Sequence, residues 1–459
     1  MLDCTKRMAE HIVGLKYNDL PGETIEKTKR HILDILGVML PSHNFERGCR
    51  TLAEIAIESG GTEESTLIGI GGKVPSYMAA FVNGSLCHPM DYDDTVDEFP
   101  NHPSAHTFPA AFAAAEKAGD ISGREFITAM ALCIDMNVRL TRAVTGRVGE
   151  DYPWFSAPIF GIFAATAAAG RMLGLSVKQM INAFGIALDR VAGITESFNS
   201  PDSEIRAIRD GYGNREGVLA ALMAKEGIEA CKNPFDILYK VYYENDYDPE
   251  ILVKDLGQDF LVRMVGLKAW PCCRVAHTHV KAAMDISKEY NIGPDEIDEI
   301  ILTVGKFGRD FLFTPLEVKK RPKSGIQAKL SLPFIMGLVF TKRRVIIEDF
   351  FTENLSDQRV LEVADRTAYK FDPELCSDAI GAGIIEVRTK NGDSIIRRED
   401  IPYGNPANPL DDDEIMAKFK ECARYAPKPM DKGRVATIME KILGLEYVEN
   451  IKEISELIS

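Results

Sequence analysis

The densest group of ionisable side chains in this sequence lies in the segment 88–109. The segment reads His-Pro-Met-Asp-Tyr-Asp-Asp-Thr at 88–95 and His-Pro-Ser-Ala-His-Thr-Phe-Pro at 102–109, and an alanine-rich run follows directly. Its acids and histidines include Asp91, Asp93, Asp94, His88, His102 and His106. A folded core does not need so many charged groups beside an apolar helix, because burying a charge is costly unless the charge is paired or used. We therefore look here first for proton-transfer chemistry or metal binding.

Three interpretations of this segment are open. In the one that we favour, Asp91 and His102 carry protons as general acid and base, and Thr95 orients the reacting groups. In the second, carboxylates and imidazoles hold Mg, Mn, Fe or Zn, and the ligands are His88, Asp91, Asp93, Asp94 and His102. Against a metal, the segment has no HExxH or ExxH pattern, and Pro89 and Pro103 interrupt any regular helix that would carry the ligands. In the third, the aspartates only cap the next segment and one histidine belongs to the core.

Two arginines, Arg206 and Arg209, stand three residues apart just before an expected glycine-rich helix start. Arginine beside free backbone amides binds anions, and the guanidinium group fits a carboxylate through two parallel hydrogen bonds. The alternative is a solvated basic turn, whose charge is offset by Glu204, Asp210 and Glu216. The sequence alone does not decide between an anion site and a surface turn.

A further group of chemically active side chains occupies 268–279, Lys-Ala-Trp-Pro-Cys-Cys-Arg-Val-Ala-His-Thr-His. It is a poor zinc motif, because adjacent cysteines rarely share one tetrahedral site and no second cysteine pair follows at zinc spacing. A helix that starts near Arg274 would place Arg274 and His277 on one face. Together with Lys268 they would then face an active site. The alternative is a set of surface cations around a core cysteine.

The composition limits the partners and the location. The chain has 459 residues and a net charge of −15, which argues against nucleic acid and against anionic membranes as partners. Its nine cysteines are scattered, as is typical of reduced thiols, so we expect a cytoplasmic protein. The first residues lack the apolar region of a signal peptide. The most apolar run, Ala157–Ala169, is too short to span a bilayer and predicts a buried core helix.

The hydrophobic pattern predicts a mainly α protein. Helical spacing and alanine-rich runs predict helices over 25–40, 76–86, 109–118, 126–144, 159–173, 178–191, 211–224, 411–425 and 435–443. Strand signals appear after about residue 265: a β-branched run at 297–304, and two apolar runs around Asn-Gly that predict a hairpin over 383–397. We expect a large all-helical domain, residues 1–264 completed by 400–459, and a smaller inserted α+β lid domain at 265–399.

Several motifs, in the same order along the chain, resemble the MmgE/PrpD family of 2-methylcitrate dehydratase, cis-aconitate decarboxylase and iminodisuccinate epimerase. They are Asp91-Tyr-Asp-Asp-Thr95 with His102-Pro-Ser, Lys268-Ala-Trp-Pro-Cys-Cys273, Ala328-Lys329-Leu-Ser331 and Gly404-Asn-Pro-Ala-Asn-Pro409. The resemblance runs nearly end to end. It implies a helical domain with an α+β lid, a homodimer, no metal or organic cofactor, and a pocket between the domains for a small polycarboxylate.

The resemblance also assigns residues. The family's catalytic Asp, Thr and His fall on Asp91, Thr95 and His102, its lid lysine falls on Lys268, and its Cys or His falls on Cys273. We expect four further cationic or imidazole groups to bind the carboxylates of the substrate: Arg206, Arg209, Arg274 and His277.

The chain departs from the family pattern at several positions of the expected substrate site. Phe155 stands where the family has a second histidine, and Phe334 where it has a tyrosine, so two polar groups are lost. Arg206 and Arg209 replace the Lys and His of a Lys-x-x-His-x-Gly pattern. Arginine keeps the positive charge but cannot donate a proton, because guanidinium stays charged.

Taken together, the motifs imply a lyase of the dehydratase type. It would act on a 2-methylcitrate-like acid by moving a proton beside a carboxylate. Two alternatives stay open: an isomerase or epimerase of an imino- or amino-dicarboxylate, and a protein that binds a dicarboxylate without catalysis.

Overall fold

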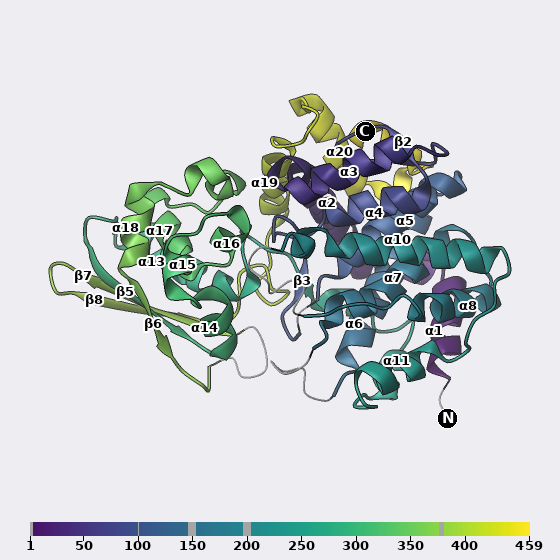
Figure 1. Ribbon diagram of the computed structural model, residues 1–459, viewed down its shortest axis with the longest axis horizontal. Helices are drawn as coiled ribbons and strands as arrows, with labels where there is room; N and C mark the ends of the chain where they lie inside the picture. Colours follow the sequence, from purple (N-terminus) through teal and green to yellow (C-terminus); the bar gives the residue numbers. More distant parts are fainter. Residues whose placement is uncertain (1–2, 100, 146–152, 196–202, 376–380) are drawn as a thin grey trace. The chain divides into compact units, whose positions relative to one another are not determined.

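The computed structural model describes residues 3–99, 101–145, 153–195, 203–375 and 381–459 of the chain (Figure 1). Helices account for 59% and strands for 9% of the residues that the structure describes, so the prediction of a mainly α protein with a small sheet in its C-terminal part is confirmed. Within the described ranges, no helix is both long and apolar enough to cross a membrane.

The chain divides into two compact units. Unit 1 consists of Met1–Pro89, Pro100–Val265 and Asp412–Ser459, and unit 2 consists of Met90–Phe99 and Gly266–Asp411. Unit 2 therefore extends beyond the expected range 265–399 in two places. Lys268 and Arg274 form ion pairs with aspartates of the segment 90–99, and the Leu267 amide donates a hydrogen bond to the Gly404 carbonyl at 2.9 Å. These contacts tie both extra segments to unit 2.

The described residues of unit 1 are mainly helical and include one short β pair. Its helices are α1 (Cys4–Gly14), η1 (Tyr17–Asp19), α2 (Gly22–Phe45), α3 (Arg47–Ser59), α4 (Ser76–Ser85), α5 (Pro103–Ala118), α6 (Gly123–Arg142), α7 (Ser156–Met172), α8 (Val177–Leu188), α10 (Ile205–Lys225), α11 (Pro234–Tyr242), α12 (Pro249–Val253), η2 (Leu261–Met264), α19 (Asp412–Ala423), α20 (Lys432–Leu443), η6 (Leu445–Tyr447) and α21 (Lys452–Ile458). The β pair joins β1 (Ser65–Thr66) to β2 (Lys73–Val74) in antiparallel register.

Helix α7 is the centre of unit 1. It is almost entirely buried and packs against α5, α6 and α10, as expected from its alanine-rich sequence. Glycines let α10 approach closely: a Cβ on Gly217 would lie 2.7 Å from the Cβ of Ala165, and one on Gly211 would lie 2.4 Å from the carbonyl oxygen of Phe81. Real Cβ atoms do not make such contacts, so small residues set the distance between these helices.

Two helices of unit 1 begin earlier than predicted. The helix expected at 109–118 begins at Pro103, because proline suits the first helical position, where its missing N–H is not needed. Pro103 therefore starts a helix, which corrects the expectation that it interrupts one. The helix expected at 211–224 begins at Ile205, so Arg206 and Arg209 lie within α10 and not in a turn before it.

A side chain from α10 repairs the break that Pro109 makes inside α5. Proline has no N–H, so the carbonyl of Ala105 loses its helical donor. The Asn214 amide donates to that carbonyl at 2.9 Å and accepts a hydrogen bond from the Ala110 N–H at 3.1 Å. Asn214 thus supports α5, the helix that carries His106, across the proline.

Unit 2 combines a four-stranded sheet with short helices. Its elements are β3 (Thr95–Val96), η3 (Arg274–Ala276), α13 (His277–Glu289), β5 (Ile297–Val304), α14 (Lys306–Leu312), α15 (Leu316–Lys320), α16 (Gly325–Lys329), α17 (Leu332–Lys342), η4 (Ile347–Phe350), η5 (Thr352–Asn354), α18 (Gln358–Asp365), β6 (Thr367–Phe371), β7 (Gly383–Thr389) and β8 (Ser394–Glu399). One further short strand, β4 (Val265–Gly266), spans the boundary between the units.

The sheet of unit 2 has the strand order β6-β5-β7-β8. Strand β5 is parallel to β6 and antiparallel to β7, and β7 and β8 form the hairpin that Asn-Gly predicted. Alternate residues of β7 are buried, where α13 packs against β7 and β8 (Figure 1). One covered face and one wetter face are typical of antiparallel sheets. This packing fixes the start of α13, where His277 lies.

Candidate active site

In unit 1, Arg209 lies beside His88, which in turn packs against His102. Its Nη2 lies 3.4 Å from the Nε2 of His88, and the His88 and His102 rings pack edge to face with centroids 4.7 Å apart. The guanidinium carbon lies 4.5 Å from the centre of the Phe155 ring, a stacking arrangement that favours a cation on an aromatic face. Helix α10 and the residues before α5 therefore bring a cation and two imidazoles together.

Asp210 balances the charge of this cluster. Its carboxylate lies 3.2 Å from the Nε of Arg209 and 3.9 Å from the Nε2 of His106, and all three side chains are buried. The His106 ring lies against Gly161 of α7, where a Cβ would come within 2.4 Å of the ring. The glycine in α7 thus makes room for an imidazole inside the helical core.

The backbone of His102 is held by its neighbour. The Asn101 side chain accepts a hydrogen bond from the His102 N–H at 2.8 Å and donates one to the Thr141 hydroxyl at 2.7 Å. His102 then caps α5, with Pro103 as the first residue of the helix. The backbone of His102 is therefore held in place at the start of a helix. A rigid backbone suits a side chain that must present a proton in a fixed geometry.

In unit 2, Lys268 binds Asp91 through two atoms. The Lys268 ammonium donates to the Asp91 carboxylate at 2.5 Å and to the Asp91 backbone carbonyl at 3.0 Å, and it lies 3.8 Å from Asp93. Asp91 has a φ of 50°, a left-handed conformation that is uncommon outside glycine. Both side chains of the pair are almost completely buried, so the lysine stabilises the strained backbone and the buried charge of Asp91 together.

The electrostatics of this pair define its role. Burial alone would lower the pKa of Lys268, but the carboxylates of Asp91 and Asp93 outweigh burial and raise it above its ordinary value. Lys268 therefore remains an ammonium ion at neutral pH and acts as a cation, not as a base. Its charge would also repel a divalent metal ion bound to the Asp91 carboxylate, which argues against Asp91 as a metal ligand.

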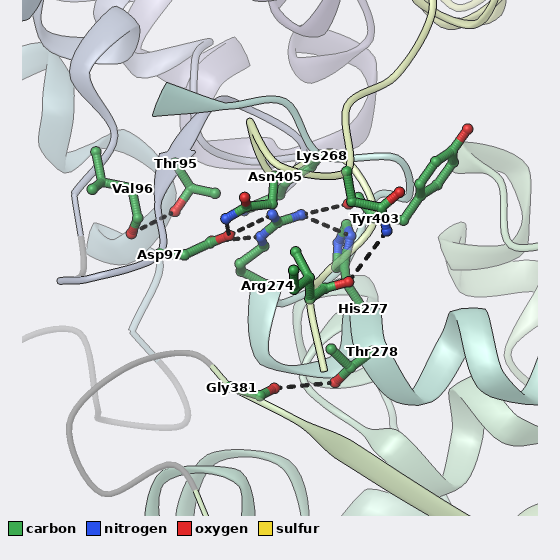
Figure 2. A network of polar contacts seen from close by, with 12 residues as sticks. Thr95, Val96, Asp97, Lys268, Arg274, His277, Thr278, Gly381, Tyr403 and Asn405 are labelled. Carbon is green, nitrogen blue, oxygen red and sulfur yellow. Dashed lines mark hydrogen bonds and ion pairs between the residues drawn. The ribbon is translucent and has the colours of Figure 1, made fainter. Parts of the chain in front are cut away.

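Arg274 is the centre of a second network in unit 2 (Figure 2). Its Nε and Nη2 each donate to one oxygen of Asp97 at 2.7 Å, the two-bond geometry in which arginine and carboxylate fit best. Its Nη1 donates to the Tyr403 carbonyl at 2.7 Å. The Asn405 amide donates to Asp97 at 2.7 Å as well. The guanidinium group thus joins three segments of unit 2.

His277 lies on the other side of Arg274, with its Nδ1 3.4 Å from Nη1 (Figure 2). This contact confirms that Arg274 and His277 share a face. The His277 ring is fully buried and lies 5.2 Å from the Trp270 ring, centre to centre. Burial, reinforced by the charges of Arg274 and Lys268, holds the pKa of His277 well below its ordinary value. His277 is therefore a neutral imidazole at physiological pH.

The two neighbouring cysteines differ. Cys272 is fully buried, and burial raises the pKa of its thiol well above the ordinary value, so it is an inert core residue. Cys273 is partly exposed, and its N–H donates to the Lys329 carbonyl at 3.1 Å.

Comparison with known proteins assigns the chain to a family. Residues 6–243 match the MmgE/PrpD N-terminal domain, and residues 270–443 match the MmgE/PrpD C-terminal domain. The chain belongs to the MmgE/PrpD family. Cis-aconitate decarboxylase of Aspergillus terreus is 25% identical over 484 residues, which cover 99% of this chain and 96% of that protein. The cis-aconitate decarboxylases of Mus musculus and Homo sapiens are also 25% identical, over 471 and 469 residues, covering 99% of this chain and 93% and 94% of theirs.

The structure of this MmgE/PrpD member sorts the predicted site residues into two groups. Unit 1 brings together His102, Phe155 and Arg209. Unit 2 brings together Asp91 and Lys268, and separately Arg274 and His277. The roles assigned to these residues stay predictions.

Three further predicted residues lie in β3, α10 and α17. Thr95 is buried in β3, and Arg206 is half-buried on the first turn of α10. Phe334 is fully buried in α17, where its ring lies 6.5 Å from that of Phe350, centre to centre. Phe334 thus packs against another aromatic side chain in the core. Its role at a substrate site stays a prediction.

Sequence reasoning missed Asp97 and Asn405 as members of the network around Arg274. A signal for each existed. Asp97 stands two residues after Thr95 in the acidic segment, and Asn405 belongs to the Gly-Asn-Pro-Ala-Asn-Pro motif. Neither signal shows that the two segments meet at Arg274, because they are separated by about three hundred residues.

Proposed function

We propose that this protein is a lyase that acts on a small polycarboxylate by moving a proton beside a carboxylate. The observation that carries the proposal is the buried Asp91–Lys268 pair, with its 2.5 Å contact and its left-handed Asp91. Such a costly arrangement is retained where a fixed charge is needed. Support also comes from the relatives named cis-aconitate decarboxylase, which this chain matches over 99% of its length.

The chemistry requires two kinds of groups. When a carboxylate leaves as carbon dioxide, the electron pair of the broken carbon–carbon bond spreads onto the remaining unsaturated carboxylate, and a proton then joins carbon. When water is eliminated, a proton leaves carbon and the departing hydroxide takes up a proton. Both reactions need a cation beside the developing anion and a proton carrier. We assign the cation to Lys268 and the proton carrier to His102.

Other residues receive supporting roles in the proposal. Asp91 holds Lys268 in place, Thr95 orients the substrate, and Cys273 is the candidate for a second proton donor. Arg206 and Arg209 bind carboxylates, with Phe155 as the platform on which Arg209 stacks. We further propose that the protein is a homodimer, works without a metal or organic cofactor and acts in the cytoplasm. Light scattering and dialysis against a chelator test the first two statements.

The test of the proposed function is proton NMR in D2O. The purified protein is incubated with cis-aconitate, 2-methylcitrate, citrate, malate-like acids and iminodisuccinate in turn. New olefinic signals with loss of a carboxylate from cis-aconitate indicate a decarboxylase, and olefinic signals from a hydroxy acid indicate a dehydratase. Deuterium exchange or conversion of diastereomers without elimination makes the protein an isomerase or epimerase instead. Binding without any exchange makes it a non-catalytic binder.

A single substitution tests the assignment of the proton carrier. His102→Asn keeps a polar side chain of similar size at the cap of α5 but removes the titratable imidazole, so turnover should fall by a factor on the order of 100 or more. Circular dichroism should show unchanged helix content. Turnover within about threefold of the unmodified protein would remove His102 from its role and leave the lyase proposal intact.

A further inference from the structure

The Gly-Asn-Pro-Ala-Asn-Pro motif at 404–409 forms a loop of unit 2 that is held by its own hydrogen bonds. The Gly404 N–H donates to the Asn408 carbonyl at 2.8 Å, and the Asn408 N–H donates to the Asn405 carbonyl at 2.8 Å. Prolines at 402, 406 and 409 fix the backbone φ at three further positions. The proposed reaction assigns no role to this motif, yet a loop so constrained can hold other segments in place.

The backbone of the loop holds the segment that carries Lys268. The N–H of Leu267, the residue before this lysine, donates to the Gly404 carbonyl at 2.9 Å. Gly404 has a φ of 88°, a conformation that favours glycine, and a Cβ on Gly404 would collide with the Leu267 carbonyl oxygen. A Cβ on Gly266 would lie 2.6 Å from the Gly404 carbonyl oxygen. Two glycines therefore permit this close contact.

The side chain of Asn405 holds the segment that carries Asp91. Its Nδ2 donates to the Asp97 carboxylate at 2.7 Å (Figure 2), and Asp97 belongs to the same short segment, 90–99, as Asp91. The Oδ1 of Asn405 accepts from the Ala407 N–H at 2.8 Å. An amide oxygen accepts and an amide nitrogen donates, so the two contacts agree on one orientation of the amide. A single loop thus holds both segments that meet in the Asp91–Lys268 pair.

The Asp91–Lys268 pair depends closely on where these two segments lie. The ammonium group contacts the Asp91 carboxylate at 2.5 Å and the Asp91 carbonyl at 3.0 Å, and the next residues are joined by the Tyr92 hydroxyl, which donates to the Ala269 carbonyl at 3.1 Å. A reacting group has to be held to within about 0.5 Å of its productive position. A small shift of either segment should therefore change the surroundings of the Lys268 ammonium group.

We propose that Asn405 is a positioning residue for the ammonium group of Lys268. It acts through Asp97, whose segment carries Asp91, while the neighbouring Gly404 carbonyl holds the segment of the lysine. The effect of Asn405 on turnover rests on the proposed function, in which Lys268 is the cation beside the developing charge. Its effect on the position of the ammonium group does not.

Asn405→Asp tests the proposal, because aspartate has the same shape and still accepts from the Ala407 N–H. It replaces the donor to Asp97 with a carboxylate oxygen, so the two carboxylates repel each other and the segment 90–99 should move. We expect the 15N NMR signal of the Lys268 ammonium group to shift in the full-length protein labelled with 15N-lysine. Lys268→Arg identifies that signal by its loss. An unchanged signal in a folded Asn405→Asp protein overturns the proposal.

The same loop supplies a matched control. The Asn408 side chain donates to the Ile401 carbonyl at 3.3 Å, so Asn408→Asp adds the same charge to the loop and also removes a donor. It should leave the Lys268 signal in place. If it shifts the signal as much as Asn405→Asp does, the effect is one of added charge or of a loosened loop, and the positioning role of Asn405 is wrong.

A second variant keeps the test decisive if Asn405→Asp does not fold. Asn405→Ala removes the donor to Asp97 without adding a charge. The Lys268 signal should shift in the same direction but by a smaller amount, and an unchanged signal overturns the proposal here as well. Circular dichroism shows whether each variant is folded.

Turnover separates this proposal from the proposed function. With an acid that the protein converts, Asn405→Asp should lower kcat by a factor on the order of ten and change KM by less than about threefold, because a displaced cation stabilises the developing charge less well. A shifted Lys268 signal with an unchanged kcat overturns the role of Asn405 in catalysis. If the unmodified protein converts none of the acids, the proposed function fails, and the Lys268 signal alone decides the positioning role.

Discussion

Two arginine–aspartate–histidine clusters, one in each unit, use the same residue types in different ways. In unit 1, Arg209 contacts the adjacent Asp210 at 3.2 Å and stacks on Phe155. In unit 2, Arg274 makes two 2.7 Å bonds to the distant Asp97 and a third to a backbone carbonyl. The Arg209 ion pair joins two neighbouring residues of α10, whereas the bonds of Arg274 join segments that lie far apart in the chain and so organise unit 2 around the guanidinium group.

The comparison teaches that a buried arginine near histidine is not by itself a substrate-binding group. The two clusters differ in how far along the chain the aspartate partner of each arginine stands. We therefore expect Arg274 to stabilise unit 2, and we predict that Arg209, which stacks on Phe155, recognises carboxylates.

The largest expected effect is that of Lys268→Met. Removal of the ammonium leaves Asp91 buried, charged and in a strained conformation, so the free energy of unfolding of unit 2 should fall by about 3–5 kcal/mol. Chemical denaturation measures this free energy. The chain has one tryptophan in each unit, so the fluorescence of Trp270 in a Trp154→Phe background reports the unfolding of unit 2. Lys281→Met is the control: its pair with Asp285 is about 30% exposed on both sides and should contribute less than about 1 kcal/mol.

The direct test of the comparison is to replace each arginine with methionine. Arg274→Met leaves Asp97 with one hydrogen bond and separates three segments, so it should destabilise unit 2 by about 3 kcal/mol. Arg209→Met should destabilise unit 1 by only about 1–2 kcal/mol, because His106 can share the charge of Asp210 and methionine packs on Phe155. The effects on KM should be reversed, with the larger rise for Arg209→Met. Equal effects of both variants on stability and KM would break the comparison.

Two neutral histidines, one half-buried in unit 1 and one buried in unit 2, should make both units sensitive to acid. Burial lowers the pKa of His11 in unit 1 and of His279 in unit 2 from 6.5 to about 4. Between these values the unfolded chain binds the extra proton, so stability is complete above pH 6.5 and falls as the pH drops toward 4, by up to about 3 kcal/mol for each histidine. Denaturation at pH 7 and pH 5 measures the loss.

A neutral replacement separates the two contributions to the acid sensitivity. His279 donates to the Thr303 carbonyl at 3.0 Å, and His279→Gln keeps a donor there. His279→Gln should reduce the pH dependence of the free energy of unfolding of unit 2 alone. His11→Gln should have the same effect on unit 1. If His279→Gln or His11→Gln still loses as much stability at low pH as the unmodified protein, another group is responsible for the titration.

The smallest effect that we predict concerns the scaffold of unit 1. Asn214→Ala removes both hydrogen bonds that bridge the break at Pro109, so unit 1 should lose about 1–2 kcal/mol. Trp154 fluorescence in a Trp270→Phe background reports it. The double variant Asn214→Ala with Pro109→Ala should recover most of the loss, because alanine restores the N–H that the carbonyl of Ala105 lacks. No recovery would mean that Asn214 acts through packing.

Much of the fold follows from local patterns. The strand at 297–304 and the hairpin around Asn391-Gly392 form where β-branched residues and a turn pair predict them, and α2 begins beside Pro21 as expected. The starts of α5 and α10 were not predicted correctly. Pro103 is itself a local signal for a helix start, whereas α10 packs closely against α4 and α7, and no local pattern shows these contacts.

The sequence by itself determined the family, the mainly α class and the segments that carry chemistry, because residue types and short spacings are local properties. Only the tertiary structure decided which charges pair. Asp97 and Arg274 are 177 positions apart, and nothing local distinguishes Asp97 from its neighbours Asp93 and Asp94. A salt bridge forms where two segments of the folded chain come together, so the tertiary structure sets the partner of each buried charge.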